Sequence, residues 1–184
     1  MSESTRIWFL TGEPGIGKTE VLAKAVTLLK GRGLTVGGVI SREVRVHGVR
    51  IGFDLMDIGT ERRGTLASIT TKVGPKVGKY KVNLQDVAEI GGQGLLKAAE
   101  TSEIIVCDEV GPMELYSPEF RRAIKVAVES GKPLLGTIHK RVKDPFVEDV
   151  KRLPFTEVIE VTQENRDGLS AELAAKVLKM IESG

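Results

Sequence analysis

One short run near the start of the sequence, GEPGIGKT, matches G-x-x-x-x-G-K-[ST], the pattern of a loop that holds phosphate, at every fixed position. Glycines let the backbone curl until successive amide N–H groups point at phosphate oxygens. A following helix adds its positive dipole end. We expect the lysine to reach the β- and γ-phosphates and the threonine hydroxyl to bind Mg²⁺. The predicted nucleotide-binding residues are Gly12, Glu13, Pro14, Gly15, Ile16, Gly17, Lys18 and Thr19.

Two adjacent acids, Asp108 and Glu109, end a short apolar run and could complete such a site. A buried strand that ends in an acid can hold magnesium from the far side of a phosphate loop, so we expect Asp108 to contact the metal through water. Glu109 is placed to accept a proton from the water that attacks the γ-phosphate. An ordinary surface turn is the alternative. Because a kinase must exclude water, the adjacent glutamate favours hydrolysis, with Lys18 and Glu109 as catalytic residues and Thr19 and Asp108 as metal ligands.

These residues need a framework, and short apolar runs alternate with amphipathic stretches, as in an α/β domain with a mainly parallel sheet flanked by helices. The phosphate loop lies between a buried strand, 6–11, and a helix expected over 18–30, which argues against a chance match in a glycine turn. The acidic pair ends a strand at 104–108. Further strands are expected at 35–41, 79–82, 134–138 and 158–161, and further helices from Asn83, from Ser117 and over 169–181.

The stretch after the second predicted strand departs from the parallel pattern. Residues 44–58 alternate apolar and polar side chains around His47-Gly48, which predicts an antiparallel β-hairpin insertion. Residues 59–78 are polar, basic and glycine-bearing with little periodicity, and we expect a functional or mobile loop. Because no repeat or linker interrupts the pattern, residues 1–184 are predicted to form a single domain.

The overall charge is modest but uneven. The net charge of +2 does not by itself indicate a nucleic-acid or membrane partner, whereas residues 42–81 carry nine Lys or Arg against four Asp or Glu. Such a surface could attract a nucleotide or another polyanion, and a solvated loop explains it equally well. Cys107 is the only cysteine, and no apolar run approaches the roughly 18 residues of a membrane span. We expect a cytoplasmic monomer without a membrane partner.

Five segments carry a resemblance to a known family: FLTGEPGIGKT (9–19), GGVISREVRVHGVRIGFDL (37–55), VGKYKVNL (77–84), CDEVGPMELYSPEF (107–120) and VTQENR (161–166). With these segments in this order, the chain resembles the thermophile-type nucleoside-triphosphatases, the family of the cancer-related nucleoside-triphosphatase. The resemblance implies a RecA-like P-loop domain and slow, Mg²⁺-dependent hydrolysis of ATP, GTP and other nucleoside triphosphates with broad base specificity. It also implies a second nucleotide-binding segment, Ile104, Ile105, Val106, Cys107, Asp108, Glu109, Val110 and Gly111.

Four polar residues near predicted strand ends have two readings each. Thr137 could sense the γ-phosphate or the attacking water, or could satisfy backbone groups at a strand end. His139, which the family does not require, could titrate near neutral pH, although a loop histidine more often has no such role. Asn165 and Arg166 could touch the base or ribose, while Asn165 could instead cap the last helix.

The charges of the predicted hairpin also have two readings. Arg45 or Arg50 could offset γ-phosphate charge in the transition state, as finger arginines do. The alternative, which we favour slightly, is charge pairing with Glu43 or Asp54. Trp8, Met113 and Cys107 are expected to serve packing.

Two functions compete with hydrolysis. A phosphotransferase would pass the γ-phosphate to a nucleoside, a nucleotide or an RNA end, and residues 59–78 could close on that acceptor. A regulatory switch would use nucleotide binding to present a partner surface and use slow hydrolysis to reset it. Phosphate release compared with labelled-acceptor transfer separates the first rival, and a partner bound only in the ATP state would identify the second.

Overall fold

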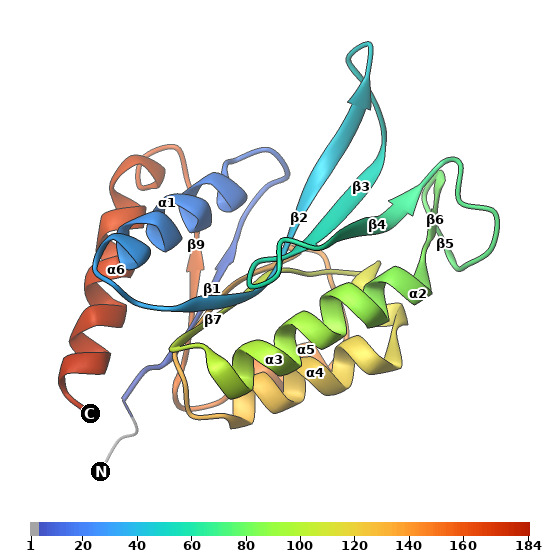
Figure 1. The fold of residues 1–184 in the computed structure, drawn as a ribbon. Helices are drawn as coiled ribbons and strands as arrows, with labels where there is room; N and C mark the ends of the chain where they lie inside the picture. The colour runs from blue at the N-terminus through green and yellow to red at the C-terminus, as the bar shows by residue number, and fades with distance from the viewer. Residues whose placement is uncertain (1–3) are drawn as a thin grey trace.

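A nine-stranded mixed sheet crosses the protein in the order β5-β6-β4-β3-β2-β7-β8-β1-β9 (Figure 1). The structure, a computed structural model, describes residues 4–184. The strands are β1 (Ile7–Thr11), β2 (Val36–Val46), β3 (Val49–Asp57), β4 (Arg63–Ser68), β5 (Lys76–Val77), β6 (Tyr80–Val82), β7 (Ile104–Val110), β8 (Leu134–Ile138) and β9 (Thr156–Glu160).

Five of these strands, β2-β7-β8-β1-β9, pair in parallel and form the part of the sheet that positions the predicted site. β8 lies between β1, which precedes the phosphate loop, and β7, which carries the acidic pair, as the RecA-like type requires. Parallel strands bring their carboxyl ends to one edge, where ligands of α/β proteins bind. The predicted α/β P-loop architecture is therefore confirmed.

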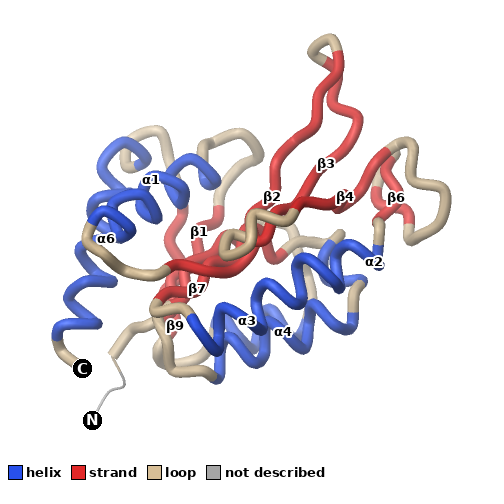
Figure 2. Tube along the Cα trace, in the orientation of Figure 1, coloured by secondary structure: helices blue, strands red, loops and turns tan. Residues whose placement is uncertain are grey.

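Helices cover both faces of this parallel part (Figure 2). α1 and α6 lie on one face, while α3 and α4 lie together on the other. No helix in the described part of the chain is long and apolar enough to cross a membrane. The helical segments are α1 (Lys18–Gly31), α2 (Leu84–Asp86), η1 (Val87–Gly92), α3 (Gln93–Thr101), η2 (Glu114–Tyr116), α4 (Pro118–Glu129), α5 (Pro145–Lys151) and α6 (Arg166–Glu182).

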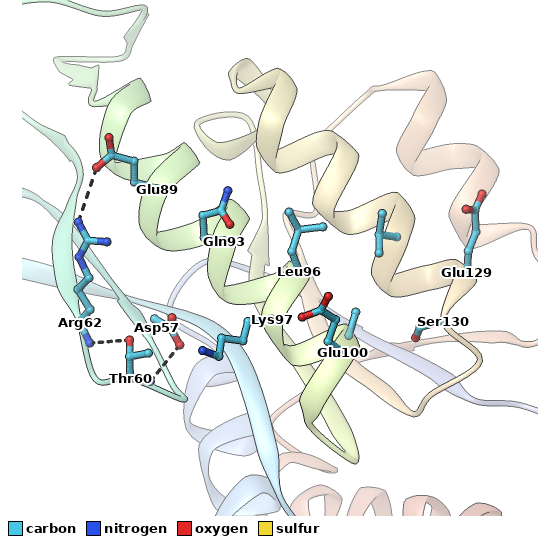
Figure 3. Close-up of a pocket in the computed structure, with 12 residues that line it drawn as sticks. Asp57, Thr60, Arg62, Glu89, Gln93, Leu96, Lys97, Glu100, Glu129 and Ser130 are labelled. Atoms are coloured by element: carbon cyan, nitrogen blue, oxygen red, sulfur yellow. Dashed lines mark hydrogen bonds and ion pairs between the residues drawn. The ribbon is translucent and has the colours of Figure 1, made fainter.

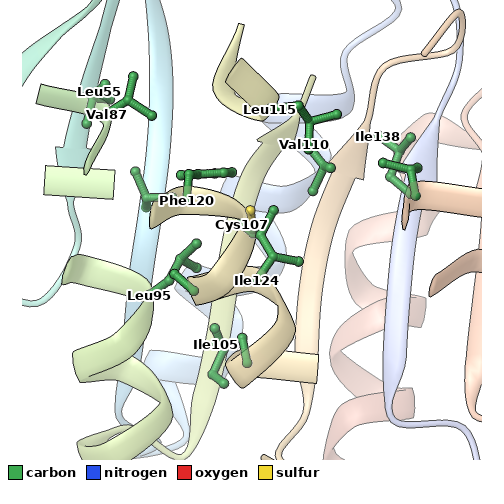
Figure 4. Packing of buried hydrophobic residues seen from close by; sticks show 14 of the residues in the cluster. Leu55, Val87, Leu95, Ile105, Cys107, Val110, Leu115, Phe120, Ile124 and Ile138 are labelled. Atoms are coloured by element: carbon green, nitrogen blue, oxygen red, sulfur yellow. The ribbon is translucent and has the colours of Figure 1, made fainter. Parts of the chain in front are cut away.

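Alternation along the buried strands divides the core into two clusters. In β1, Ile7 and Phe9 pack toward α3 and α4, whereas Trp8 and Leu10 pack toward α1 and α6. Successive side chains of a strand point to opposite faces, so a strand with helices on both faces is apolar throughout. Figure 4 shows part of the first cluster, in which Cys107 of β7 lies among aliphatic side chains and Phe120. The packing roles expected for Trp8 and Cys107 are confirmed.

The other four strands, β3 to β6, extend the sheet in antiparallel fashion. The predicted hairpin is present as β2 and β3, which project beyond the body of the protein (Figure 1). The expectation of a loop over 59–78 is wrong, because β4 and β5 both lie within this stretch. Only Leu66 and Ala67 of β4 are buried. Such a short apolar signal predicts no strand, and pairing with β3 and β6 supplies the structure.

The remaining differences from the sequence prediction are local. The helix expected from Asn83 begins as predicted, since the Asn83 side chain accepts a hydrogen bond of 3.1 Å from the Asp86 N–H. The glycine-bearing stretch after it forms the π-helical turn η1, which joins α2 to α3. Ser117 caps α4 as expected. Helix α5, which the sequence analysis did not predict, begins at Pro145 behind an Asp144 cap.

Candidate functional site

The phosphate loop connects β1 to α1 and depends on three glycines with positive φ, Gly12 (150°), Gly15 (80°) and Gly17 (111°). These φ values lie in a region that residues other than glycine rarely adopt. At Gly12 a Cβ atom would also lie 2.9 Å from the Val161 carbonyl oxygen. The loop is therefore shaped by backbone requirements that the motif encodes directly, and α1 begins at Lys18 with its N-terminus at the loop.

The Lys18 side chain turns back over the loop. Its Nζ donates to the carbonyl oxygen of Gly12 at 3.1 Å and approaches that of Glu13 at 3.5 Å. Both acceptors belong to the loop itself, so the ammonium group is already held at the place where the motif predicts phosphate. The next residue, Thr19, is exposed and lies on the first turn of α1.

Asp108 is 3% exposed near the end of β7, although it is an acid. The Thr137 hydroxyl, on β8, donates a 2.6 Å hydrogen bond to its Oδ1. Its Oδ2 is buried and has no hydrogen-bond partner among the residues that the structure describes. Burial raises the pKa of Asp108, and the hydroxyl groups of Thr137 and Thr19 and the charge of Lys18 act against that rise. Thr19, Lys18 and Asp108 therefore meet at one place, as predicted, and Thr137 joins them.

Glu109 follows Asp108 where the register between β7 and β8 shifts, and the peptide bond between the two acids is cis. Burial, and next the charge of Asp108, raise the pKa of Glu109 to about 7, while Lys18 lowers it. A carboxyl group with a pKa near neutrality suits proton transfer at physiological pH. The pKa of both acids is raised, but their surroundings differ: Asp108 is the more buried and accepts a hydrogen bond from a threonine, whereas Glu109 lies beside the charge of Asp108.

Glu114 is a third buried acid that the sequence analysis did not identify. It lies in η2 and is 6% exposed. A Cβ atom on Gly111 would lie 2.8 Å from Glu109 Oε1 and 2.9 Å from Glu114 Oε2, so the two carboxyl groups flank the same glycine. Burial, and next the charge of Glu109, raise the pKa of Glu114 well above its usual value. A glutamate between Met113 and Leu115 was the available signal, but only the fold shows its burial.

The oxygen atoms at this place fit a magnesium ion. The Asp108 Oδ2 is a buried acceptor with no hydrogen-bond donor among residues 4–184, and the Thr19 hydroxyl lies nearby. Mg²⁺ prefers oxygen ligands and is commonly held by one or two carboxylates together with substrate phosphates. Within residues 4–184 no group of three or more His, Cys, Asp or Glu side chains could hold a metal alone. The donor set therefore fits a metal that arrives with phosphate.

The remaining residues of the segment 104–111 pack in the core or lie next to the acidic residues. Ile105 and Cys107 lie on one face of β7, and Ile104 and Val106 lie on the other. Val110 packs in the first core cluster, and Gly111 lies between Glu109 and Glu114. Burial raises the pKa of Cys107 well above its usual value, so the thiol stays protonated.

The two hairpin arginines form ion pairs with the same acidic residue. Arg45 and Arg50 both bind Glu43, at 2.8 Å and 2.9 Å. Arg50 also donates to the Tyr80 hydroxyl at 2.9 Å and lies over the Phe53 ring at 5.0 Å. The pairing with Glu43 that we favoured is present, whereas no pairing with Asp54 is found for these two arginines in the described residues.

The other candidates lie around the phosphate loop. His139 accepts a hydrogen bond from the Arg141 N–H, and burial with the nearby Lys18 charge lowers its pKa. Asn165 accepts from the Thr162 N–H at 2.8 Å, so its side chain fixes the turn before α6 and leaves the helix end uncapped. Arg166 donates to the carbonyl oxygen of Ile16 at 3.2 Å, which ties α6 to the phosphate loop.

An unforeseen ion pair crosses the same loop. Lys140, which follows β8, contacts Glu13 at 2.6 Å and Glu160 at 3.5 Å. It joins positions 127 residues apart in the sequence, which no local pattern could show.

A separate hollow lies between the turn after β3 and helices α3 and α4 (Figure 3). It has a volume of about 840 Å³ and a mixed lining that includes Asp57, Arg62, Glu89, Lys97 and Glu129. The ion pair between Arg62 and Glu89, at 3.6 Å, crosses one end. None of the residues predicted for phosphate chemistry lines it.

Comparison with known proteins identifies the family of this chain. A family model described as NTPase matches residues 7–174. The nucleoside-triphosphatase THEP1 of Thermofilum pendens is 40% identical over 175 residues, which cover 95% of this chain and 96% of that protein. THEP1 of Methanosarcina barkeri is 43% identical over 172 residues, 93% of this chain and 97% of that protein.

Two solved structures share the fold. The crystal structure of THEP1 from Aquifex aeolicus superposes with a TM-score of 0.80 at 31% identity, covering 91% of this chain and 96% of that one. The solution structure of a human cancer-related nucleoside triphosphatase gives 0.77 at 32% identity, with 98% and 99% covered. The chain therefore belongs to the NTPase family of P-loop nucleoside-triphosphatases.

Proposed function

We propose that this protein hydrolyses nucleoside triphosphates to the diphosphate and inorganic phosphate at the site formed by the phosphate loop and the end of β7. The observation that carries the proposal is the raised pKa of Glu109, about 7, directly beside Asp108. Such a carboxylate can take a proton from water, whereas a phosphotransferase must keep water out. Family membership supports the same reaction.

Each residue has a separate part in the proposed reaction. The backbone N–H groups of Gly15, Gly17 and Lys18 and the Lys18 ammonium hold the phosphates and offset the charge that develops on them. Thr19 and Asp108 would hold Mg²⁺, which would neutralise negative charge on the bound phosphates. Thr137 orients Asp108. Glu109 accepts the proton of the attacking water. Because these groups address phosphate and not the base, we propose that ATP and GTP are both substrates.

The test compares the wild-type protein with Glu109→Gln and Lys18→Ala, using phosphate release and binding of Mg·ATP as separate readouts. Glu109→Gln should bind Mg·ATP and release almost no phosphate, since the amide cannot accept the proton. Lys18→Ala should lose affinity or turnover. Full phosphate release by Glu109→Gln would contradict the assigned base, and an unchanged Lys18→Ala would contradict the site as a whole.

The same assay with a labelled acceptor separates hydrolysis from phosphotransfer. Nucleosides, nucleotides and RNA ends are the acceptors to supply, with the labelled γ-phosphate followed into product and into free phosphate. We expect the label in free phosphate. Label that accumulates on an acceptor in excess of free phosphate would support the kinase instead.

A further inference from the structure

The loop that joins β8 to α5 carries a concentration of positive charge beside the proposed site. It begins next to the acidic pair, because the His139 N–H donates to the Val110 carbonyl oxygen at 3.3 Å. It ends at Asp144, whose carboxylate accepts two hydrogen bonds from Arg121. The loop is thus fixed at both ends. Its basic or titratable side chains before Asp144 are His139, Lys140, Arg141 and Lys143.

Lys140 connects this loop to the phosphate loop. Its Nζ lies 2.6 Å from Glu13 Oε1, and Glu160 at the end of β9 is a second, more distant partner at 3.5 Å. Glu13 is the second residue of the phosphate loop and is exposed. The bond to Lys140 is the main cause that lowers the pKa of Glu13, with smaller contributions from Arg141 and Lys18. Glu13 is therefore ionised and faces a cationic surrounding.

A carboxylate in this position opposes the binding that the loop is built for. The loop amides, Lys18 and the α1 dipole attract a polyanion, whereas the Glu13 charge repels it. The pair with Lys140 is solvent-exposed, with side-chain exposures of 40% and 62%, and such pairs are weak enough to exchange. A lysine also has a flexible stem and three donors, so its ammonium group can change partners without moving the backbone.

We propose that Lys140, in the β8–α5 loop, leaves Glu13 when a nucleoside triphosphate binds. Its ammonium group then binds the terminal phosphate of the nucleotide. This inference rests on the proposed function, since it requires the triphosphate in the phosphate loop. The triphosphate carries more negative charge than Glu13 and therefore competes for the ammonium group. Lys18 and Lys140 then contribute charge from two different elements, and Glu13 holds Lys140 in place until the nucleotide arrives.

The test measures the affinity for a non-hydrolysable ATP analogue and for ADP, each with Mg²⁺, by calorimetry. The proteins are the wild type, Lys140→Ala, Glu13→Gln, the double variant Glu13→Gln/Lys140→Ala, and Lys143→Ala as a control of equal charge from the same loop. Lys140→Ala should lower the affinity for the triphosphate analogue about tenfold, the size of one charge-assisted contact. The affinity for ADP should fall less than about twofold. Glu13→Gln should bind the analogue more tightly, and Lys143→Ala should resemble the wild type.

The double variant separates a phosphate ligand from a mere counter-ion of Glu13. If Lys140 binds phosphate, its removal costs about tenfold in the Glu13→Gln background too. If Lys140→Ala causes no loss of affinity in the Glu13→Gln background, the proposal is overturned. It is also overturned if Lys140→Ala and Lys143→Ala bind the triphosphate analogue with equal affinity. Thermal unfolding and the restoring variant Lys140→Arg exclude misfolding as the cause. Phosphate release by the wild type is measured on the same sample, so failure of the proposed hydrolysis would be recognised independently.

Discussion

The Thr137 hydroxyl donates a hydrogen bond of 2.6 Å to Asp108 Oδ1 and so links the ends of two adjacent strands inside the proposed site. Thr137 is completely buried, and the second oxygen of Asp108 has no hydrogen-bond partner within residues 4–184. One carboxylate oxygen is thus held by the protein, and the other is the oxygen that we propose binds the metal ion. The hydroxyl fixes the direction in which the carboxylate faces the phosphate loop.

Thr137→Val should test this orientation, because valine keeps the shape and removes the donor. Loss of a hydrogen bond to a buried charged group is expected to lower the free energy of unfolding by roughly 1–3 kcal/mol, measured by urea unfolding. Phosphate release should fall, and the concentration of Mg²⁺ needed for half-maximal rate should rise. Thr137→Ser, which retains the hydroxyl, is the matched control. A Thr137→Val protein with wild-type Mg²⁺ dependence would show that the bond does not position Asp108.

Glu109 should make the activity and the stability respond to pH in opposite directions. As the proposed base, it must be ionised, so kcat/KM for ATP should rise with pH through a limb near 7. The pKa of Glu109 is about 7 in the folded protein, compared with the ordinary 4.5. Between pH 4.5 and 7 the folded protein therefore keeps a proton on Glu109 that the unfolded chain has released. Stability contributed by the protonated group is therefore lost as pH rises through that interval.

Glu109→Gln should consequently be inactive and more stable than the wild type above pH 7. The gain amounts to up to about 3 kcal/mol at pH 8 and vanishes near pH 4.5. Urea unfolding at both pH values, with metal removed by a chelator, measures it. The exposed Glu129→Gln on α4 is the control and should show no such gain. Equal stability of Glu109→Gln and the wild type at pH 8 would contradict the raised pKa.

The parts of the site that sequence alone predicts are those whose requirements are local. Gly12, Gly15 and Gly17 are needed because the backbone there has positive φ, and this need is visible in the motif itself. Asp108 and Glu109 are visible because they end an apolar run that both faces of a parallel sheet require. Strand and helix boundaries in this region agree with the prediction to within a few residues.

The parts that sequence does not show depend on contacts between distant elements. The Thr137 bond to Asp108 spans 29 residues, and the Lys140 bond to Glu13 spans 127. Glu114 is an acid in an amphipathic run until the fold places it beside Gly111. Strand β4 likewise gains its structure from its neighbours. Tertiary contacts, and not residue type, decide each of these.

Glu114→Gln should raise stability at alkaline pH. Burial keeps the pKa of Glu114 well above its usual value, so ionisation at high pH opposes folding, and a neutral amide of the same shape avoids that cost. We expect a higher urea midpoint than wild type at pH 9 and convergence of the two near pH 4.5. The exposed Glu119→Gln on the following helix is the control. A Glu114→Gln protein that folds but releases no phosphate would instead assign Glu114 to the reaction.

Removal of the hairpin arginines should alter stability more than catalysis. Arg45 and Arg50 share Glu43, and Arg50 also contacts Tyr80 and Phe53. We expect Arg50→Ala to lower the free energy of unfolding by about 1–2 kcal/mol through loss of the hydrogen bond and the ring contact. Arg45→Ala removes an exposed ion pair and should lower the free energy of unfolding by less than about 1 kcal/mol.

Single-turnover phosphate release distinguishes this structural role from that of a finger arginine. An arginine that offsets γ-phosphate charge in the transition state contributes roughly 10³-fold or more to the rate. We expect Arg45→Ala and Arg50→Ala to stay within about threefold of the wild type, because both guanidinium groups are already bound to Glu43 on the projecting hairpin. Arg42→Ala, on the same strand as Arg45, is the charge-matched control. A hundredfold or greater loss in either variant at wild-type ATP affinity would mean that the hairpin rearranges and delivers that arginine to the phosphate.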